Sequence, residues 1–80
     1  MQSGDDDVLG LQLSRHAGRR MTLRGISATH VLRVIALCLQ PVDQGDGTFL
    51  FRAFVDNRDL GVVRARDGVI VTVLDFSEPG

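Results

Sequence analysis

Residue types and spacing that could do chemistry appear first in the stretch from Ser14 to Ser27. It holds four of the nine arginines, one of the two histidines and no acid. His16, Arg20 and Arg24 recur at every fourth position, and residues four apart share one face of a helix. Guanidinium groups bind phosphate in a two-pronged way, and imidazole can transfer a proton near neutral pH. A solvated basic helix face has the same spacing and is the commoner structure.

Metal-independent cleavage of RNA needs a base for the 2′-hydroxyl, an acid for the 5′-oxygen, and cations that stabilise the charge developing on the phosphate. We therefore take His16 as the candidate acid–base residue, and Arg20 and Arg24 as the candidate phosphate ligands. Thr72 becomes a further candidate if its face of the sheet meets the first helix. Three later arginines could extend an anion-binding track along an RNA backbone: Arg52, Arg64 and Arg66.

Each of these residues also has a purely structural interpretation. His16 could satisfy a hydrogen bond at the start of its helix, and Arg20 and Arg24 could form ion pairs. Thr72 could be a β-forming residue in a core-facing row, and the later arginines could be exposed strand residues. His30 is interpreted as an exposed or capping residue, because a helix N-terminus disfavours the charged imidazolium. The candidate acidic partners of the helical arginines are Asp56, Asp59 and Asp75.

Length and composition limit the class of protein. Eighty residues indicate one small domain. No apolar run approaches the ~20 residues of a membrane span, and the acidic first residues lack the features of a signal peptide, so we expect a cytoplasmic protein. Cys38 is the only cysteine, which excludes an intrachain disulfide. It forms no zinc motif with the two histidines, and we expect no metal or cofactor.

Charge is distributed unevenly along the chain although the net charge is only −1. Residues 1–7 carry three aspartates, residues 8–42 carry five arginines and no acid, and residues 43–80 carry four arginines and seven acids. An acid-free basic block beside an acidic remainder indicates a local anion-binding surface that the overall charge conceals.

Capping residues predict two consecutive helices. Ser14 and Gly25 are the expected N-cap and C′ residue of a helix over 15–24. Ser27 is the expected N-cap of a second and more buried helix over 28–39.

Alternating β-branched and aromatic residues predict a short strand within 8–13 and, after the helices, a three-stranded antiparallel meander. We expect a hairpin loop over 56–59 and a two-residue type I′ turn at Asp67-Gly68. The three strands of the meander are expected over 48–55, 60–66 and 69–76. Because the helices are segregated from the main strands, the fold class is α+β.

A two-residue turn at Asp67-Gly68 would fix the pairing of the strands on either side of it. The expected pairs are Arg66 with Val69, Arg64 with Val71, Val63 with Thr72 and Val62 with Val73. We expect the smoother of the two faces to pack on the helices; it carries Gly61, Val63, Ala65, Ile70, Thr72, Leu74 and Phe76.

The segments SRHAGRRMTLRGIS and VVRARDGVIVTVL together resemble the family catalogued as domain of unknown function 4258. This resemblance covers about residues 11–75 and implies a fold similar to the RelE-like toxins of the barnase–EndoU–colicin–RelE group. Many members of that group are metal-independent endoribonucleases that pair with an antitoxin, and others have lost activity. The matching positions are Ser14, His16, Ala17, Arg20, Met21, Arg24, Gly25 and Ile26, then Val71, Thr72 and Val73.

We therefore expect a single RelE-like α+β domain over residues 9–76, with a flexible acidic leader at 1–8 and a short tail at 77–80. One functional hypothesis is a metal-independent endoribonuclease of toxin–antitoxin type, or a degenerate relative of one, with RNA as substrate and an antitoxin as partner. The other is a non-catalytic binding module that docks its basic helix on a protein or a nucleic acid. No membrane partner is expected.

Overall fold

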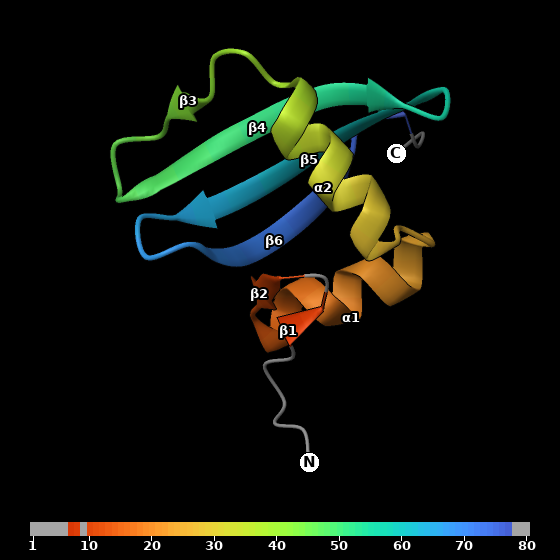
Figure 1. Cartoon of the computed structure of the whole chain (residues 1–80), viewed down its shortest axis with the longest axis horizontal. Coiled ribbons are helices and arrows are strands. Elements are labelled where there is room, and N and C mark those ends of the chain that lie inside the picture. Colours follow the sequence, from red (N-terminus) through yellow and green to blue (C-terminus); the bar gives the residue numbers. More distant parts are fainter. Residues whose placement is uncertain (1–6, 9, 78–80) are drawn as a thin grey trace.

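The α+β class predicted from the sequence is confirmed by the computed structural model, which describes residues 7–8 and 10–77 (Figure 1). Residues 1–6 of the predicted leader and 78–80 of the predicted tail lie outside the described residues. In chain order the elements are β1 (Asp7–Val8), β2 (Leu11–Leu13), α1 (Arg15–Arg24), α2 (Ala28–Leu37), β3 (Val42–Asp43), β4 (Thr48–Val55), β5 (Arg58–Ala65) and β6 (Val69–Asp75).

One sheet contains six strands in the order β1-β2-β6-β5-β4-β3. The predicted antiparallel meander is present as β4, β5 and β6, and β2 runs parallel to β6, pairing Leu13 with Ile70. The sequence pattern does not predict the edge strands β1 and β3, because two residues are too few to show alternation. Gly10, with φ 81°, turns β1 back onto β2, and Gly45 and Gly47 also have positive φ in the loop between β3 and β4.

The predicted helix caps are present. Ser14 Oγ accepts a hydrogen bond from the Ala17 N–H at 3.0 Å, which caps α1. Gly25 closes α1 in the left-handed conformation, with φ 66° and ψ 38°. Ser27 caps α2 by accepting from the His30 N–H at 3.2 Å.

The second helix is shorter than predicted. It ends at Leu37, and Cys38 already has extended backbone angles of φ −76° and ψ 112°. Leu37 and Leu39 are 57% and 90% exposed, so no packing contact stabilises a further helical turn. Both helices lie on one side of the sheet, with α1 along β6 and α2 across β4 and β5 (Figure 1).

Apart from Ile70, the face of the sheet that packs on the helices is the opposite of the predicted one. Ile70 was predicted on the packing face and is buried in the core, because the bulge in the β5–β6 pairing sets it opposite Arg64. Leu60, Val62 and Val73 are buried in the core with residues of both helices, and we call this side the helix face. Val63 and Thr72 alternate with them and lie on the other side, which we call the outer face. The prediction was wrong because both faces carry apolar side chains, so alternation alone does not choose between them.

The β5–β6 turn also differs from the predicted type I′ turn. Gly68 has φ 95°, but Asp67 lacks the positive φ that a type I′ turn requires. A bulge then shifts the register, and Arg64 pairs with Ile70 instead of Val71. Arg66 belongs to the turn and not to β5, whereas two predicted pairs are confirmed: Val63 with Thr72 and Val62 with Val73.

The β4–β5 connection is shorter than the predicted loop over 56–59. Asp56 and Asn57 alone form it, with φ 52° and 64°. Positive φ at both positions is what a two-residue type I′ turn needs, and Asp and Asn tolerate it best after Gly. Arg58 and Asp59 are therefore strand residues, and their side chains point to opposite faces of the sheet.

Candidate binding surface on helix α1

Helix α1 is fixed to the sheet at its first turn and along one side. Ser14 Oγ donates to the Val71 carbonyl of β6 at 2.8 Å, and the Ser14 N–H donates to the Ile70 carbonyl at 2.9 Å. Ala17 and Met21, which follow on the same side of the helix, are 0% and 7% exposed. This attachment decides which side chains of α1 remain open to solvent.

The predicted stripe of His16, Arg20 and Arg24 is divided by that packing. His16 is exposed, whereas Arg20 and Arg24 are half-buried. The Nε of Arg20 is closed off from solvent and has no hydrogen-bond partner within the described residues. Hydrogen bonds from Arg58 are the main cause of the lowered pKa of Asp75, and the charge of Arg24 adds to that effect. Of the three side chains, only that of His16 is exposed.

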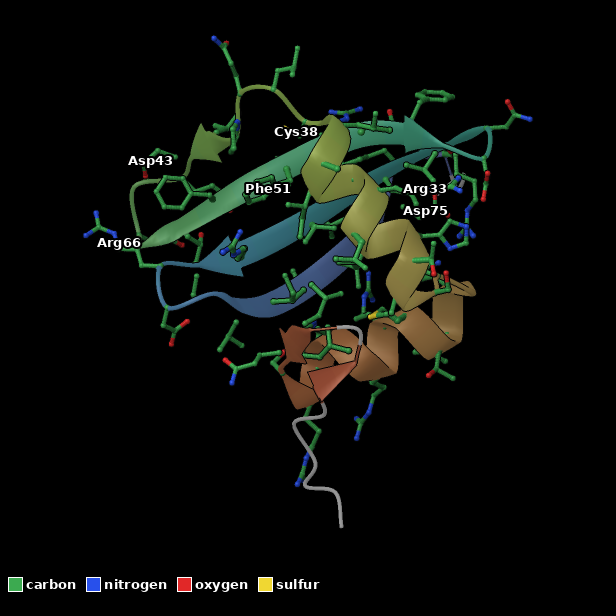
Figure 2. The ribbon with its side chains drawn as sticks, viewed as in Figure 1. Arg33, Cys38, Asp43, Phe51, Arg66 and Asp75 are labelled. Carbon is green, nitrogen blue, oxygen red and sulfur yellow. The ribbon has the colours of Figure 1, made fainter. Side chains whose placement is uncertain are left out.

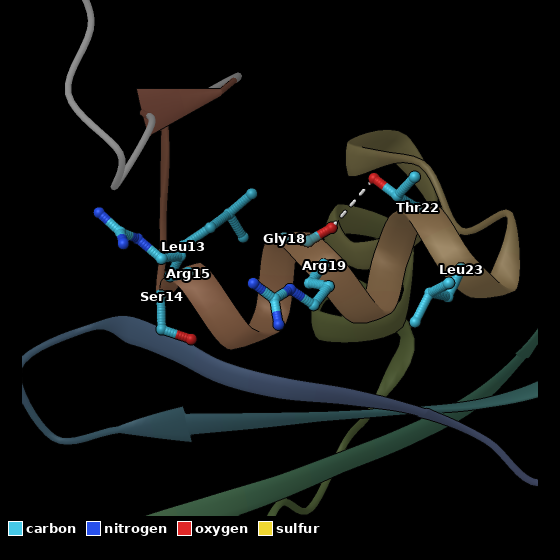
Figure 3. A pocket seen from close by; sticks show the side chains of 7 residues that line it. All are labelled: Leu13, Ser14, Arg15, Gly18, Arg19, Thr22 and Leu23. Carbon is cyan, nitrogen blue, oxygen red and sulfur yellow. Dashed lines mark hydrogen bonds between the residues drawn. The ribbon is translucent and has the colours of Figure 1, made fainter.

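Arg15 and Arg19 are the arginines of α1 that solvent reaches freely. They border a depression of about 470 Å³ on the side of the helix turned away from α2 (Figure 3). Gly18 lies between them, and a Cβ added there would meet no atom within 4 Å. The residues that line the depression are Leu13, Ser14, Arg15, Gly18, Arg19, Thr22 and Leu23.

Positive charge and apolar surface meet in this depression. None of its lining residues is acidic, and Leu23 is 71% exposed. The Thr22 hydroxyl donates to the Gly18 carbonyl at 3.2 Å (Figure 3). Guanidinium groups bind a carboxylate or phosphate through two parallel hydrogen bonds. The arrangement can therefore hold an anion beside an apolar group.

Sequence reasoning did not select Arg15 and Arg19 although a signal for them exists. They are four residues apart, as the members of the predicted stripe are, so spacing alone does not separate the two sets. What separates them is the side on which α1 packs. The spacing of Leu13, Ala17 and Met21 predicts one apolar stripe that can face a core, and all three are buried in the structure.

Arg52 lies on the outer face and is held by neighbouring side chains. Its Nε and Nη2 donate to the two carboxylate oxygens of Asp59 at 3.0 and 2.7 Å. Its guanidinium carbon is 4.0 Å from the centre of the Phe76 ring. The hydrogen bonds from Arg52 lower the pKa of Asp59. The structure thus places Arg52 in an ion pair on the face away from α1.

The remaining predicted residues are not gathered around α1. Arg64 is half-buried, with its guanidinium carbon 6.0 Å from the centre of the Phe51 ring, and Arg66 is exposed in the β5–β6 turn (Figure 2). Thr72 lies on the outer face, because its neighbour Val73 is buried on the helix face. The condition for a role of Thr72, that its face meets the first helix, is therefore not met.

Ser27, His30 and Asp56 form a polar cluster with the residue types of a catalytic triad. His30 Nδ1 lies 2.9 Å from Ser27 Oγ, and His30 Nε2 lies 3.0 Å from Asp56 Oδ2. The backbone N–H of Ser27 donates to the same Nδ1 at 2.9 Å and occupies its single lone pair. His30 therefore cannot accept the proton of the Ser27 hydroxyl. The cluster is a capping box that joins α2 to the β4–β5 turn, and the capping interpretation of His30 is confirmed.

Arg58 joins three elements of the fold. The sequence analysis did not select it, because it falls within the predicted loop over 56–59. Its Nε and Nη2 donate to Asp75 Oδ2 at 3.2 and 2.7 Å, and the Asp75 side chain is only 3% exposed. Its Nη1 and Nη2 also donate to the carbonyls of Gly25 and Arg24 at 3.0 and 2.7 Å. One guanidinium thus links β5, β6 and the carbonyls that the end of α1 leaves free.

Comparisons with known proteins give no relative: no family model, no curated protein and no solved structure matches the chain. The resemblance to the family of domain of unknown function 4258 therefore stays a prediction from the sequence. Within the described residues, no group of three or more His, Cys, Asp or Glu side chains could hold a metal ion. In the same part of the chain, neither helix is long and apolar enough to cross a membrane.

Proposed function

We propose that this protein is a non-catalytic binding module that docks one side of α1 on an acidic segment of a partner protein. We call this side, which carries Arg15, Arg19 and Leu23, the outer side of α1. The observation that carries the proposal is the depression in which the exposed cations Arg15 and Arg19 stand beside Leu13 and Leu23. Carboxylates of the partner would bind the guanidinium groups, and an apolar side chain between them would enter the depression. A segment in which acidic and aliphatic residues alternate has this chemistry.

The lining of the depression favours a protein partner over RNA. Proteins that bind single-stranded RNA commonly stack its bases on exposed aromatic rings. None of the lining residues is aromatic, and the exposed rings of Phe54 and Phe76 lie on the outer face of the sheet. The exposed Leu23 offers nothing to a phosphate backbone, whereas an apolar side chain of a protein partner can cover it.

The arrangement supports the endoribonuclease hypothesis less well. That hypothesis requires His16, Arg20 and Arg24 to act on one phosphate, and Thr72 joins them only if its face of the sheet meets the first helix. Thr72 lies on the outer face, and the two arginines are half-buried. His16 is exposed, but no second acid–base group accompanies it among the lining or neighbouring residues of α1 that the structure describes. A test of the proposal therefore has to be able to detect RNA cleavage.

The test is a fluorescence anisotropy titration with a labelled peptide in which glutamates alternate with leucines. The comparison ligands are the same peptide with glutamine in place of glutamate and a single-stranded RNA of equal net charge. The test variant combines Arg15→Gln and Arg19→Gln. The matched control combines Arg33→Gln and Arg66→Gln, which removes two exposed cations elsewhere on the surface.

We expect the glutamate peptide to bind and the test variant to weaken it at least about tenfold, because charge-assisted hydrogen bonds contribute roughly 1.5–3 kcal/mol each. The control variant should bind within about twofold of wild type, and the affinity should fall with added salt. Equal losses in the two double variants would contradict α1 as the site. Tight binding and cleavage of the RNA, abolished by His16→Ala, would replace the proposal by the endoribonuclease hypothesis.

A further inference from the structure

The outer face of the sheet is an apolar surface that neither helix covers. Both helices pack on the helix face, through partners such as Leu60 and Val62. Phe54 is 67% exposed and Phe76 is 41% exposed on the outer face. An extended apolar patch of this kind usually marks an interaction site. Its main side chains are those of Leu50, Arg52, Phe54, Leu74 and Phe76, and Val63 lies among them with 8% of its surface exposed.

The charged groups within this face neutralise each other. Arg52 and Asp59 are joined by two hydrogen bonds of 3.0 and 2.7 Å, and the guanidinium also lies over the Phe76 ring. A face with a closed ion pair at its centre does not repel a second copy of itself. The outer side of α1, where the lining residues include two arginines and no acid, would repel its own copy.

Bulky and short side chains divide the outer face along the strand direction. Near the β4–β5 turn, Phe54 is exposed and the Phe76 ring covers Gly61, where an added Cβ would lie 2.7 Å from Phe76 Cε2. Farther along β5, Val63 pairs with Thr72, and both side chains are short. A two-fold axis that lies between two copies and runs across the strands reverses the strand direction of one copy relative to the other. The end of the face with the phenylalanine rings then lies over the end with the short side chains of the second copy.

We infer that the outer face is the interface of a homodimer and that its occupant is a second copy of this chain. Phe76 lies near Thr72 of the second copy, and Phe54 lies near Leu50 of the second copy, with the two sheets packed face to face about 10 Å apart. A standard interface needs about 800 Å² per partner, which is roughly a sixth of the 5045 Å² that the chain exposes. The dimer leaves both α1 surfaces free, so this inference does not rest on the proposed function.

Sedimentation equilibrium of the full chain tests the inference, at protein concentrations up to about 0.5 mM. A reductant is included because Cys38 is only half-buried. The test variant is Phe54→Arg, and the matched control is Leu39→Arg, which places the same charge at a 90% exposed leucine beyond α2. Circular dichroism checks that each variant folds, and Phe54→Ser takes the place of Phe54→Arg if the arginine variant does not.

We expect a dimer whose dissociation constant rises at least about 30-fold in the Phe54 variant, as for an aromatic residue that the partner buries in an interface. Leu39→Arg should dimerise as wild type does. A wild-type chain that stays monomeric throughout the concentration range overturns the inference. So does a Phe54 variant that dimerises as wild type does, or a Leu39→Arg protein that dissociates equally.

Discussion

The arginines on the outer side of α1 and those at the β4–β5 end of the sheet use their charge differently. Arg15 and Arg19 are exposed and border a depression whose lining contains no acid. Arg52 and Arg58 each donate two hydrogen bonds to an aspartate, and Arg58 donates two more to the end of α1. One residue type therefore stabilises the fold in one region and stays available to a ligand in the other.

The positions of the acids explain this difference. Residues 8–42 contain no acid at all, so within that block the arginines of α1 have no carboxylate neighbour. Residues 43–80 contain seven acids, and β-strand pairing sets Asp59 and Asp75 beside Arg52 and Arg58. An arginine thus stabilises the fold where folding places an aspartate beside it, and stays available to a ligand where it does not.

Arg58→Ala should have the largest effect on stability. It deprives the Asp75 carboxylate, whose side chain is 3% exposed, of its main partner and frees two carbonyls at the end of α1. Removing one member of a buried ion pair costs about 3–5 kcal/mol; since the Arg58 side chain is partly exposed, we expect about 3 kcal/mol in urea unfolding. A loss below about 1 kcal/mol would make Arg58 no more structural than a surface arginine.

Acid should destabilise the fold through two aspartates at the β4–β5 end of the sheet, Asp59 and Asp75. Hydrogen bonds from Arg58 and Arg52 lower the pKa of Asp75 and Asp59 below the ordinary value of 3.8. A lowered carboxyl pKa stabilises the fold above that ordinary value, and the stabilisation is lost as pH falls through the folded-state pKa. Melting temperatures across this pH range should fall for wild type. Arg52→Gln combined with Arg58→Gln should flatten that fall; a curve parallel to wild type would contradict the assignment.

Arg52→Ala should destabilise the fold less than Arg58→Ala, although both remove an arginine–aspartate pair. The Arg52 side chain is 54% exposed and the Asp59 side chain is 22% exposed, so water replaces much of the lost interaction. Urea unfolding of the two variants under the same conditions gives the order directly. The reverse order would mean that the outer-face pair, and not Arg58, holds this end of the sheet together.

Arg15→Ala and Arg19→Ala should have the smallest effects. Both side chains are exposed, and exposed substitutions of this kind change the free energy of unfolding by less than about 0.5 kcal/mol. Their urea midpoints should therefore match that of wild type. A loss comparable to that of Arg58→Ala would remove the distinction between the two regions.

The capping residues, which act locally, predict the helices well. The packing face of the sheet and the bulge depend on contacts between residues far apart in the sequence. Ser14, Gly25 and Ser27 act within a few residues of themselves, so the starts of both helices and the end of α1 followed from the sequence. The packing face of the sheet did not, because it depends on which apolar row meets α1 and α2. The bulge opposite Arg64 and Val63 also has no local signature.

The candidate site shows the same limit. The spacing predicts the basic helix and its core-facing row of Leu13, Ala17 and Met21, all of which are buried. It does not predict that the packing of this row also half-buries Arg20 and Arg24. The predicted loop over 56–59 includes Arg58, because the sequence DNRD contains several turn-forming residues. Only the pairing of β4 with β5 shows that two residues suffice for the turn and that Arg58 points to the helix face.

Chemical-shift mapping by NMR tests the division between the two regions most directly. The alternating glutamate–leucine peptide is titrated into the ¹⁵N-labelled wild-type chain, and backbone and arginine Nε signals are followed. We predict shifts over residues 13–23 and at the Nε of Arg15 and Arg19, with the signals of Arg52 and Arg58 unchanged. Shifts centred on Arg52 and Arg58, with α1 unaffected, would contradict the account.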